Sequence, residues 1–170
     1  MTTFVALLRA VNVGGTGKLP MSDLKAMCED CGFARVQTYI ASGNVVFTSR
    51  KSEVTVKSEL EDCLASYAGK PVAVAIRTAG EMAKVCSDNP FPAAPANWTV
   101  AIFLDKPPPA DALNGIRGRA DEEIGLGRRE IYVHYGAGLG RSKLIIPAAK
   151  DGTARNMNTI AKLAEMAAEL

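Results

Sequence analysis

Asparagine, glycine and basic residues are concentrated in four short segments of this chain, and together they could hold an anion. None of the four contains an aspartate or a glutamate. Lysine and arginine supply positive charge, and the backbone N–H groups of glycine-rich turns can point at a phosphate or carboxylate. The pattern predicts an anion-binding surface but identifies neither the anion nor a reaction. The segments are LLRAVNVGGTGKLPM (7–21), YIASGNVVF (39–47), GLGRSKL (138–144) and TARNMNT (153–159).

The glycine-rich loop of the first segment does not match either common nucleotide motif. A P-loop needs glycine at the start of GxxxxGK and Ser or Thr after the lysine, because the hydroxyl holds Mg²⁺. Asn12 and Leu19 occupy those positions. The dinucleotide fingerprint GxGxxG also fails, since Pro20 replaces its third glycine.

Two interpretations of this loop remain. In the first, Asn12, Gly14, Gly15 and Lys18 bind an anion at the start of the helix that follows. In the second, the glycines only satisfy backbone geometry. Arg9 raises a similar question, because it interrupts an apolar strand: either the strand end is exposed, or the side chain points into a polar site.

The TARN segment is the second candidate. Thr153 is predicted to cap the last helix, with Arg155 in its first turn, where a cation opposes the helix dipole at a cost of about 0.3–1 kcal/mol. Asp151, Glu165 or solvent could compensate. Alternatively, Arg155 makes a forked contact with a phosphate or carboxylate, and Asn156 or Asn158 hydrogen-bonds a neutral part of the ligand.

Two further pairs of residues are candidates. Arg141 and Lys143 follow the glycines of 136–140 and could form another wall of the site, although solvated charges on a loop are the simpler interpretation. Ser42 and Asn44 could also bind the ligand, although turn chemistry alone explains both residue types.

Familiar catalytic sets find little support. His134 is the only histidine, and no cluster of metal ligands accompanies it, so we expect neither a metal nor a cofactor. Cys28 and Cys31 have CxxC spacing but lie late in a predicted helix, whereas a redox motif places its nucleophile at a helix N-terminus. We therefore expect reduced, structural thiols.

Composition indicates an ordinary folded protein. With 170 residues and 48% apolar content, the chain can bury a core in one domain or two small ones. Its net charge of +2 restricts any basic patch to a local one. No apolar run approaches the roughly 20 residues of a membrane span, and the start has no cationic signal-peptide region, so we expect a cytoplasmic location and no membrane partner.

The first half of the chain predicts a βαββαβ order. This is the ferredoxin-like pattern, in which two helices pack on one face of an antiparallel sheet. The short connection Ser42–Asn44 predicts a hairpin with a left-handed residue at Gly43 or Asn44. The expected strands are 4–11, 35–41, 45–49 and 71–77, and the expected helices are 22–31 and 52–67.

The second half predicts a looser repeat of that unit. A short helix is expected over 80–86. The proline-rich stretch that follows it is predicted to be a linker. The resulting α+β organisation has a ferredoxin-like subdomain over 1–78, a short helix and proline-rich linker over 79–97, and an incomplete second subdomain with a C-terminal helix over 98–170. Within 98–170 we expect strands at 98–104, 122–126 and 129–135, and helices at 110–119, 142–149 and 154–170.

The strings LLRAVNVGGTGKLPM, TYIASGNVVF, GRSKL and TARNMNTIAKL, in this order, resemble the bacterial family known as domain of unknown function 1697. The resemblance spans almost the whole chain. It implies two related α+β subdomains and a cytoplasmic protein, and it implies no activity. The chain departs from the family pattern at Ala10, where we would expect glycine, and at Met157, where we would expect tryptophan.

Three classes of function stay open at this stage. A binding module for a phosphorylated or carboxylated small ligand, or for a nucleotide, accounts for the acid-free segments. Nucleic-acid binding suits a ferredoxin-like sheet, but only 6% of residues are aromatic and no RNA-recognition signature is present. An enzyme acting on a phosphorylated or nucleotide substrate would use His134 or a carboxylate as its base. Exposed edge strands leave both monomer and homodimer open.

Overall fold

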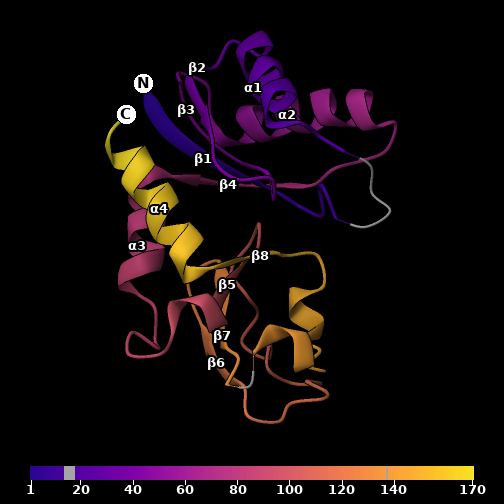
Figure 1. Cartoon of the computed structure of the whole chain (residues 1–170), viewed down its shortest axis with the longest axis vertical. Coiled ribbons are helices and arrows are strands. Elements are labelled where there is room, and N and C mark those ends of the chain that lie inside the picture. The colour runs from indigo at the N-terminus through magenta and orange to yellow at the C-terminus, as the bar shows by residue number, and fades with distance from the viewer. Residues whose placement is uncertain (14–17, 137) are drawn as a thin grey trace. The chain divides into compact units, whose positions relative to one another are not determined.

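The computed structural model describes residues 1–13, 18–136 and 138–170 of a mixed α+β protein with two antiparallel sheets (Figure 1). The chain forms two compact units. Unit 1 comprises Met1–Met82 and Lys162–Leu170, and unit 2 comprises Ala83–Ala161. The chain passes from one unit to the other within two helices, α3 (Ala79–Ser87) and α4 (Met157–Ala168).

Unit 1 has the ferredoxin-like topology expected from the sequence. Its sheet has the order β2-β3-β1-β4, and every neighbouring pair is antiparallel. Figure 1 shows both intervening helices on one face of this sheet. The elements are β1 (Thr2–Leu8), α1 (Met21–Asp30), β2 (Ala34–Thr38), β3 (Asn44–Ser49), α2 (Glu53–Ala68) and β4 (Val74–Thr78).

The core of unit 1 lies between this sheet and its two helices. Alternate residues of β1, including Phe4 and Leu8, join Leu24 of α1 and Leu60 of α2 in one apolar cluster. The other residues of the strand, such as Val5, are buried as well. Burial on both faces explains why β1 is continuously apolar rather than alternating.

Unit 2 contains a second four-stranded sheet, of order β6-β7-β5-β8. Taken in chain order, its strands have the same arrangement as those of unit 1. The predicted helices over 110–119 and 142–149 are wrong, because the described parts of these connections hold turns and two short 3-10 helices, Leu139–Arg141 and Pro147–Ala149. The strands are β5 (Thr99–Phe103), β6 (Glu123–Leu126), β7 (Glu130–His134) and β8 (Thr153–Asn156).

Local chemistry explains why these connections are not helical. Arg117 and Ile145 exchange backbone hydrogen bonds of 3.0 and 2.8 Å as an isolated antiparallel bridge between the two connections. Gly118 has a φ of +71°, and a Cβ there would lie 2.0 Å from the carbonyl oxygen of Lys143. Only glycine fits so close an approach, and glycine in this conformation ends a helix.

The last helix begins later than the sequence predicts. Thr153 to Asn156 form β8, which pairs with β5, so the prediction that Arg155 stands in the first turn of a helix is wrong. The helix starts at Met157, and Asn156 rather than Thr153 caps it: the N–H of Thr159 donates to Asn156 Oδ1 at 2.9 Å. Strand pairing has overridden a local helical pattern.

The β4–α3 and β8–α4 connections have the same local structure. Arg77 pairs with Val5 of β1, and Arg155 pairs with Ala101 of β5, the corresponding strand of unit 2. Each arginine donates a 2.9 Å hydrogen bond to the carbonyl of the residue before it. The next residue in each case, Thr78 or Asn156, accepts a backbone N–H from the first turn of the following helix.

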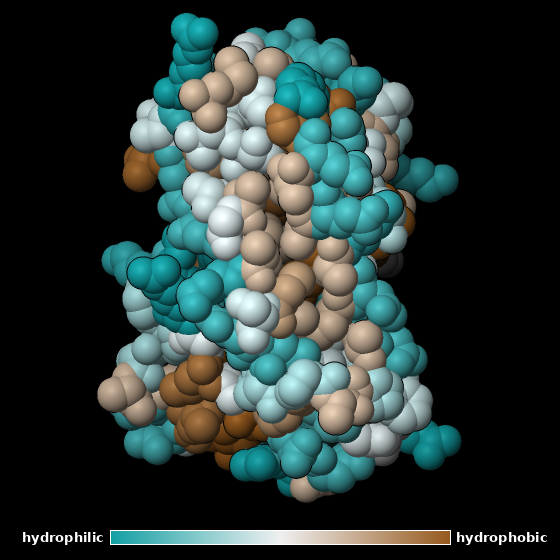
Figure 2. Space-filling model, turned by 90° about the vertical axis from the view of Figure 1, so that its left-hand side faces the viewer, coloured by the Kyte–Doolittle hydropathy of each residue, from teal (hydrophilic) through white to brown (hydrophobic). Residues whose placement is uncertain are grey.

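In the part of the chain that the structure describes, none of the helices has the length and apolarity needed to cross a membrane. Figure 2 shows one face of the molecule, where polar residues predominate and a patch of apolar residues gathers toward the lower end. Exposed apolar side chains of unit 2 include Trp98, Leu113, Leu126, Leu139 and Ile145.

Candidate functional site

The candidate residues predicted from the sequence are divided between the two units. Gly14 and Gly15 lie outside the described residues. Unit 1 holds Arg9, Asn12, Lys18, Ser42 and Asn44, whereas unit 2 holds Arg141, Lys143, Arg155 and Asn156.

Asn12 holds the loop after β1 in place. Its Oδ1 accepts the backbone N–H of Leu19 at 2.6 Å, and its Nδ2 donates to the carbonyl oxygens of Leu19 and Ala41, each at 2.8 Å. Both amide hydrogens are therefore used within the protein. Asn12 therefore closes its own loop and ties it to the β2–β3 hairpin.

Hydrogen bonds also hold the turn of the β2–β3 hairpin in place. Asn44 is fully buried, and its Nδ2 donates to the carbonyl oxygen of Tyr39 and to Ser42 Oγ, both at 2.9 Å. Gly43 has a φ of +89°, which confirms the left-handed residue predicted there. A Cβ at this position would lie 2.5 Å from Val11 Cγ2, so the turn packs directly against the loop after β1.

Backbone strain is concentrated at this end of the sheet. Ala10, Asn12 and Ile40 have φ values of 55°, 55° and 50°, and side-chain-bearing residues in this region cost about 1–2 kcal/mol each. Strain of this kind tends to accumulate at functional sites. Arg9 follows the last residue of β1, and its exposed side chain corresponds to the first of the two alternatives above.

A cavity of about 210 Å³ opens beside these loops. Leu19, Leu64 and Val72 give it apolar walls, and Lys18 and Lys70 also belong to its lining. Among the described residues, no carboxylate lines it. The cavity therefore combines an apolar interior with positive charge. The other lining residues are Ala10, Val11, Asn12, Tyr67 and Ala68.

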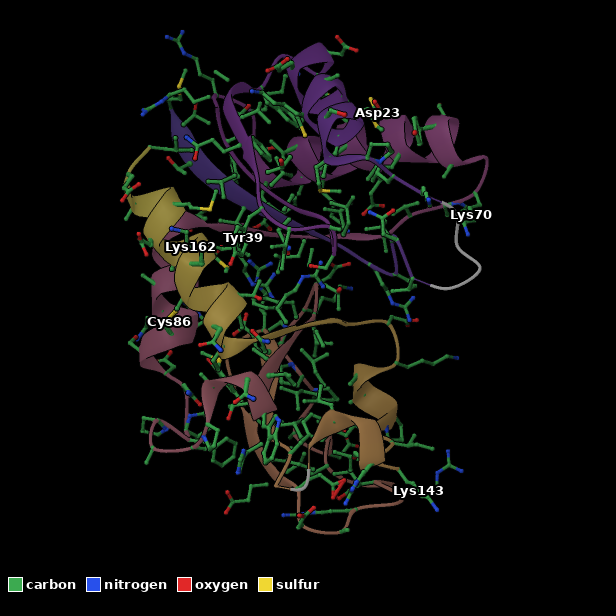
Figure 3. The ribbon with its side chains drawn as sticks, viewed as in Figure 1. Asp23, Tyr39, Lys70, Cys86, Lys143 and Lys162 are labelled. Carbon is green, nitrogen blue, oxygen red and sulfur yellow. The ribbon has the colours of Figure 1, made fainter. Side chains whose placement is uncertain are left out.

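Tyr67 lines the cavity, but its hydroxyl is not a free hydrogen-bond donor. Its hydroxyl donates a 2.8 Å hydrogen bond to Asp23 Oδ2, and this bond raises the pKa of the phenol. The hydroxyl hydrogen is thus already used, and Lys18 and Lys70 are the cationic residues among the described lining residues. Figure 3 shows Asp23 on α1 and Lys70 just beyond the end of α2.

Lys70 is placed by the way α2 ends. Gly69 caps the helix in the left-handed conformation, with a φ of 70°, and its N–H donates to the carbonyl of Ala65 at 2.9 Å. The chain then turns away from the helix axis, and Lys70 is the first residue beyond the cap. A cation at this position also complements the negative end of the helix dipole.

In unit 2, Arg141 and Lys143 border a second cavity, of about 160 Å³. Ser142 between them faces inward and donates a 2.6 Å hydrogen bond to Glu122 Oε2. Unlike the unit 1 cavity, this one has acidic residues in its lining, Asp121 as well as Glu122. Its charge is mixed, which favours an anion less. Figure 3 labels the exposed Lys143 at this site.

Arg155 lies apart from these cavity linings. It is 8% exposed, and its Nη1 donates to Thr153 Oγ1 and to the carbonyl of Ala154, both at 2.9 Å. Burial lowers the pKa of its guanidinium to about 10. Asn156 uses its side-chain oxygen to cap α4. Both residues therefore have structural contacts that the sequence pattern did not reveal.

Of the lining residues of this cavity, the sequence-based prediction included Asn12 and Lys18, but not Leu64, Tyr67 or Lys70. The helical pattern assigned Leu64 and Tyr67 to the core. Lys70 carried one usable signal, since it follows the glycine that ends α2, but a single lysine after a helix cap is too common to indicate a site.

Comparison with known proteins identifies the family of this chain. A search for similarity to curated proteins found no match. Among solved structures, the chain is similar to the conserved bacterial protein SP0830 from Streptococcus pneumoniae, with a TM-score of 0.82, 22% sequence identity and 99% of each chain covered. At this identity the likeness shows the fold alone. The model of the family described as "Protein of unknown function (DUF1697)" matches residues 1–132, and the chain belongs to that family.

Proposed function

We propose that this protein binds a small organic anion, a carboxylate or a phosphate monoester with an apolar body, in the cavity of unit 1. The observation that carries the proposal is the pairing of Lys18 and Lys70 with an apolar interior that has no carboxylate among its described lining residues. Buried apolar area would supply affinity, and the two ammonium groups would select the charge.

The size of the cavity limits the ligand. Binding sites for drug-sized molecules usually enclose about 300–1,000 Å³, and this cavity has about 210 Å³. A single ring or a short branched chain bearing one acidic group suits it. A whole nucleotide would leave much of its surface outside.

The hydrogen bonds that hold the loop after β1 in place support the same proposal. Asn12 uses both of its amide hydrogens and its side-chain oxygen to fix the loop that carries Leu19. A rigid wall loses little conformational entropy when a ligand binds, which favours binding by a small number of contacts. The left-handed residues Ala10 and Asn12 line the same cavity, so the backbone strain described above lies at the proposed site.

Isothermal titration calorimetry with benzoate, phenyl phosphate and benzyl alcohol tests the proposal. The two anions should bind, and the neutral alcohol should bind much more weakly. Lys18→Ala and Lys70→Ala should each weaken anion binding about three- to tenfold, since exposed ion pairs contribute about 1 kcal/mol. Raising the salt concentration should weaken it further.

Lys25→Ala is the matched control. Lys25 is an exposed lysine on α1 that forms an ion pair with Glu29 and does not line the cavity. Its replacement changes the net charge by the same amount as the two test variants and should leave affinity unchanged. Equal weakening in all three variants would reduce the effect to overall charge, and equal affinity for benzyl alcohol and benzoate would contradict the proposal.

A further inference from the structure

Two cysteines of unit 1 touch each other across the helices that cover its sheet. Cys31 caps the C-terminal end of α1, and Cys63 lies in α2. Their Sγ atoms are 3.2 Å apart. A disulfide bond is about 2.05 Å long, so these thiols are not bonded, but a shift of about 1 Å would join them.

We propose that Cys31 and Cys63 are a redox-modifiable pair that forms an intramolecular disulfide between α1 and α2. The pair is independent of the proposed anion site. Both residues are partly exposed, so a small oxidant can reach them. The other two cysteines differ: Cys28 is fully buried, and Cys86 belongs to unit 2.

The local structure holds the pair in register. Lys51 Nζ donates to the backbone carbonyl oxygen of Cys31 at 2.8 Å and forms an ion pair with Glu59 at 2.6 Å. Glu59 lies one turn before Cys63 on α2, so a single lysine links the end of α1 to the helix that carries the second thiol. This contact keeps the sulfur atoms adjacent before any bond forms.

The chemistry requires an electron acceptor, and a small disulfide such as oxidised glutathione can serve. A thiolate of the pair attacks one glutathione sulfur, forming a mixed disulfide and releasing one glutathione thiolate. The second cysteine gives up its proton and attacks the protein sulfur of that mixed disulfide, and the second glutathione thiolate leaves. Two protein thiols are oxidised to one disulfide, and one glutathione disulfide is reduced to two thiols.

The reaction should be slow at neutral pH. Burial, and then the hydrogen bond with Cys63, raise the pKa of the Cys31 thiol to about 12. Only the thiolate attacks a disulfide, so its small population limits the rate. The rate should therefore increase as the pH is raised from 7 to 9, and the state of the pair must be read after equilibrium is reached.

The test is to equilibrate the full chain with oxidised glutathione, alkylate the remaining thiols, and analyse intact mass and peptides. The chain has four cysteines. We expect two to resist alkylation, a mass lower by two hydrogen atoms, and a linked pair of peptides containing Cys31 and Cys63. A reductant should restore all the thiols. Stable glutathione adducts, a disulfide-linked dimer, a different linked pair or four free thiols would each overturn the proposal.

Single cysteine-to-serine variants distinguish the Cys31–Cys63 pair from the other two thiols. Cys31→Ser and Cys63→Ser should each lose the internal bond and retain one glutathione on the remaining cysteine. Cys28→Ser and Cys86→Ser should form the bond as the parent does. The oxidised parent should also melt about 5–10 °C above the reduced parent, because the bond restrains the unfolded chain. Loss of the bond in Cys86→Ser, or its persistence in Cys31→Ser, would overturn the assignment.

Discussion

Ser142 donates its hydroxyl hydrogen to Glu122 across 2.6 Å, although the two residues are separated by the whole of β6 and β7. Glu122 is only 2% exposed, and it also accepts the backbone N–H of Ala120 at 2.6 Å. The carboxylate thus fastens together the two long connections of unit 2. The inward-facing serine of the GRSKL segment has a structural contact that its sequence context did not suggest.

Replacing this serine should make stability depend less on pH. The hydrogen bond from Ser142, and then that from Ala120, lower the pKa of Glu122 below its usual 4.5. A lowered pKa in the folded state stabilises the protein above pH 4.5, and this contribution is lost as the pH falls through the lowered value. Ser142→Ala should therefore be less stable than the parent at pH 7, with a smaller difference at pH 3.

Urea unfolding at the two pH values measures this effect. Ser58→Ala, at an exposed position of α2, is the control and should differ little from the parent at either pH. If Ser142→Ala lost the same free energy of unfolding at pH 3 as at pH 7, the serine would not act through the carboxylate of Glu122.

Asn12→Ala should destabilise unit 1 by about 2–4 kcal/mol. The substitution removes three hydrogen bonds and leaves the carbonyl of Ala41 and both backbone groups of Leu19 without them, while alanine still has to adopt a φ of 55°. Chemical denaturation measures the loss. Asn97→Ala, at an exposed asparagine, should change stability by less than about 0.5 kcal/mol.

Ala10→Gly should stabilise the protein by about 0.5–1 kcal/mol. Ala10 has a φ of 55°, which glycine adopts without strain, although glycine also gains entropy in the unfolded chain. Thermal unfolding should show a melting temperature about 1–4 °C higher. Ala41→Gly serves as the comparison, because Ala41 has no positive φ and should gain nothing. A lower melting temperature for Ala10→Gly would show that no strain is stored at this position.

Arg155→Ala should lower the free energy of unfolding by about 2–4 kcal/mol. The substitution empties a buried volume and removes the hydrogen bonds to Thr153 and Ala154. This expectation differs from that for a surface ligand contact, which could be removed without a loss of stability. Arg141→Ala, at an exposed arginine, should stay within about 0.5 kcal/mol of the parent. Equal stability of the two variants would show that burial of Arg155 has no structural role.

The sequence predicted unit 1 well because its signals are local. Ser52 caps α2 and Gly69 ends it, and the hairpin turn needs the glycine at position 43. Each of these signals acts within a few residues. In unit 2, by contrast, the bridge between Arg117 and Ile145 joins segments far apart in sequence, and the pairing of β8 with β5 decides that Thr153 to Asn156 are extended.

The prediction of candidate residues was limited in the same way, because local sequence does not show tertiary contacts. The sequence singled out Asn12 and Lys18, and both line the unit 1 cavity. It also treated Arg155 as part of a ligand surface, whereas burial and two hydrogen bonds of 2.9 Å give it a structural environment. Residue type and neighbours indicate which side chains can carry charge. They do not indicate which side chains tertiary packing encloses, and so Lys70 was missed while Arg155 was chosen.

The arginine that precedes a helix cap occurs twice, at Arg77 and Arg155, in strands that occupy the same place in the two sheets. In both units the strand passes into the following helix through the same pattern of hydrogen bonds. Unit 1 connects its strands through α1 and α2, whereas the described parts of the corresponding connections of unit 2 hold turns and short 3-10 helices. The same strand order is therefore compatible with connections of very different structure.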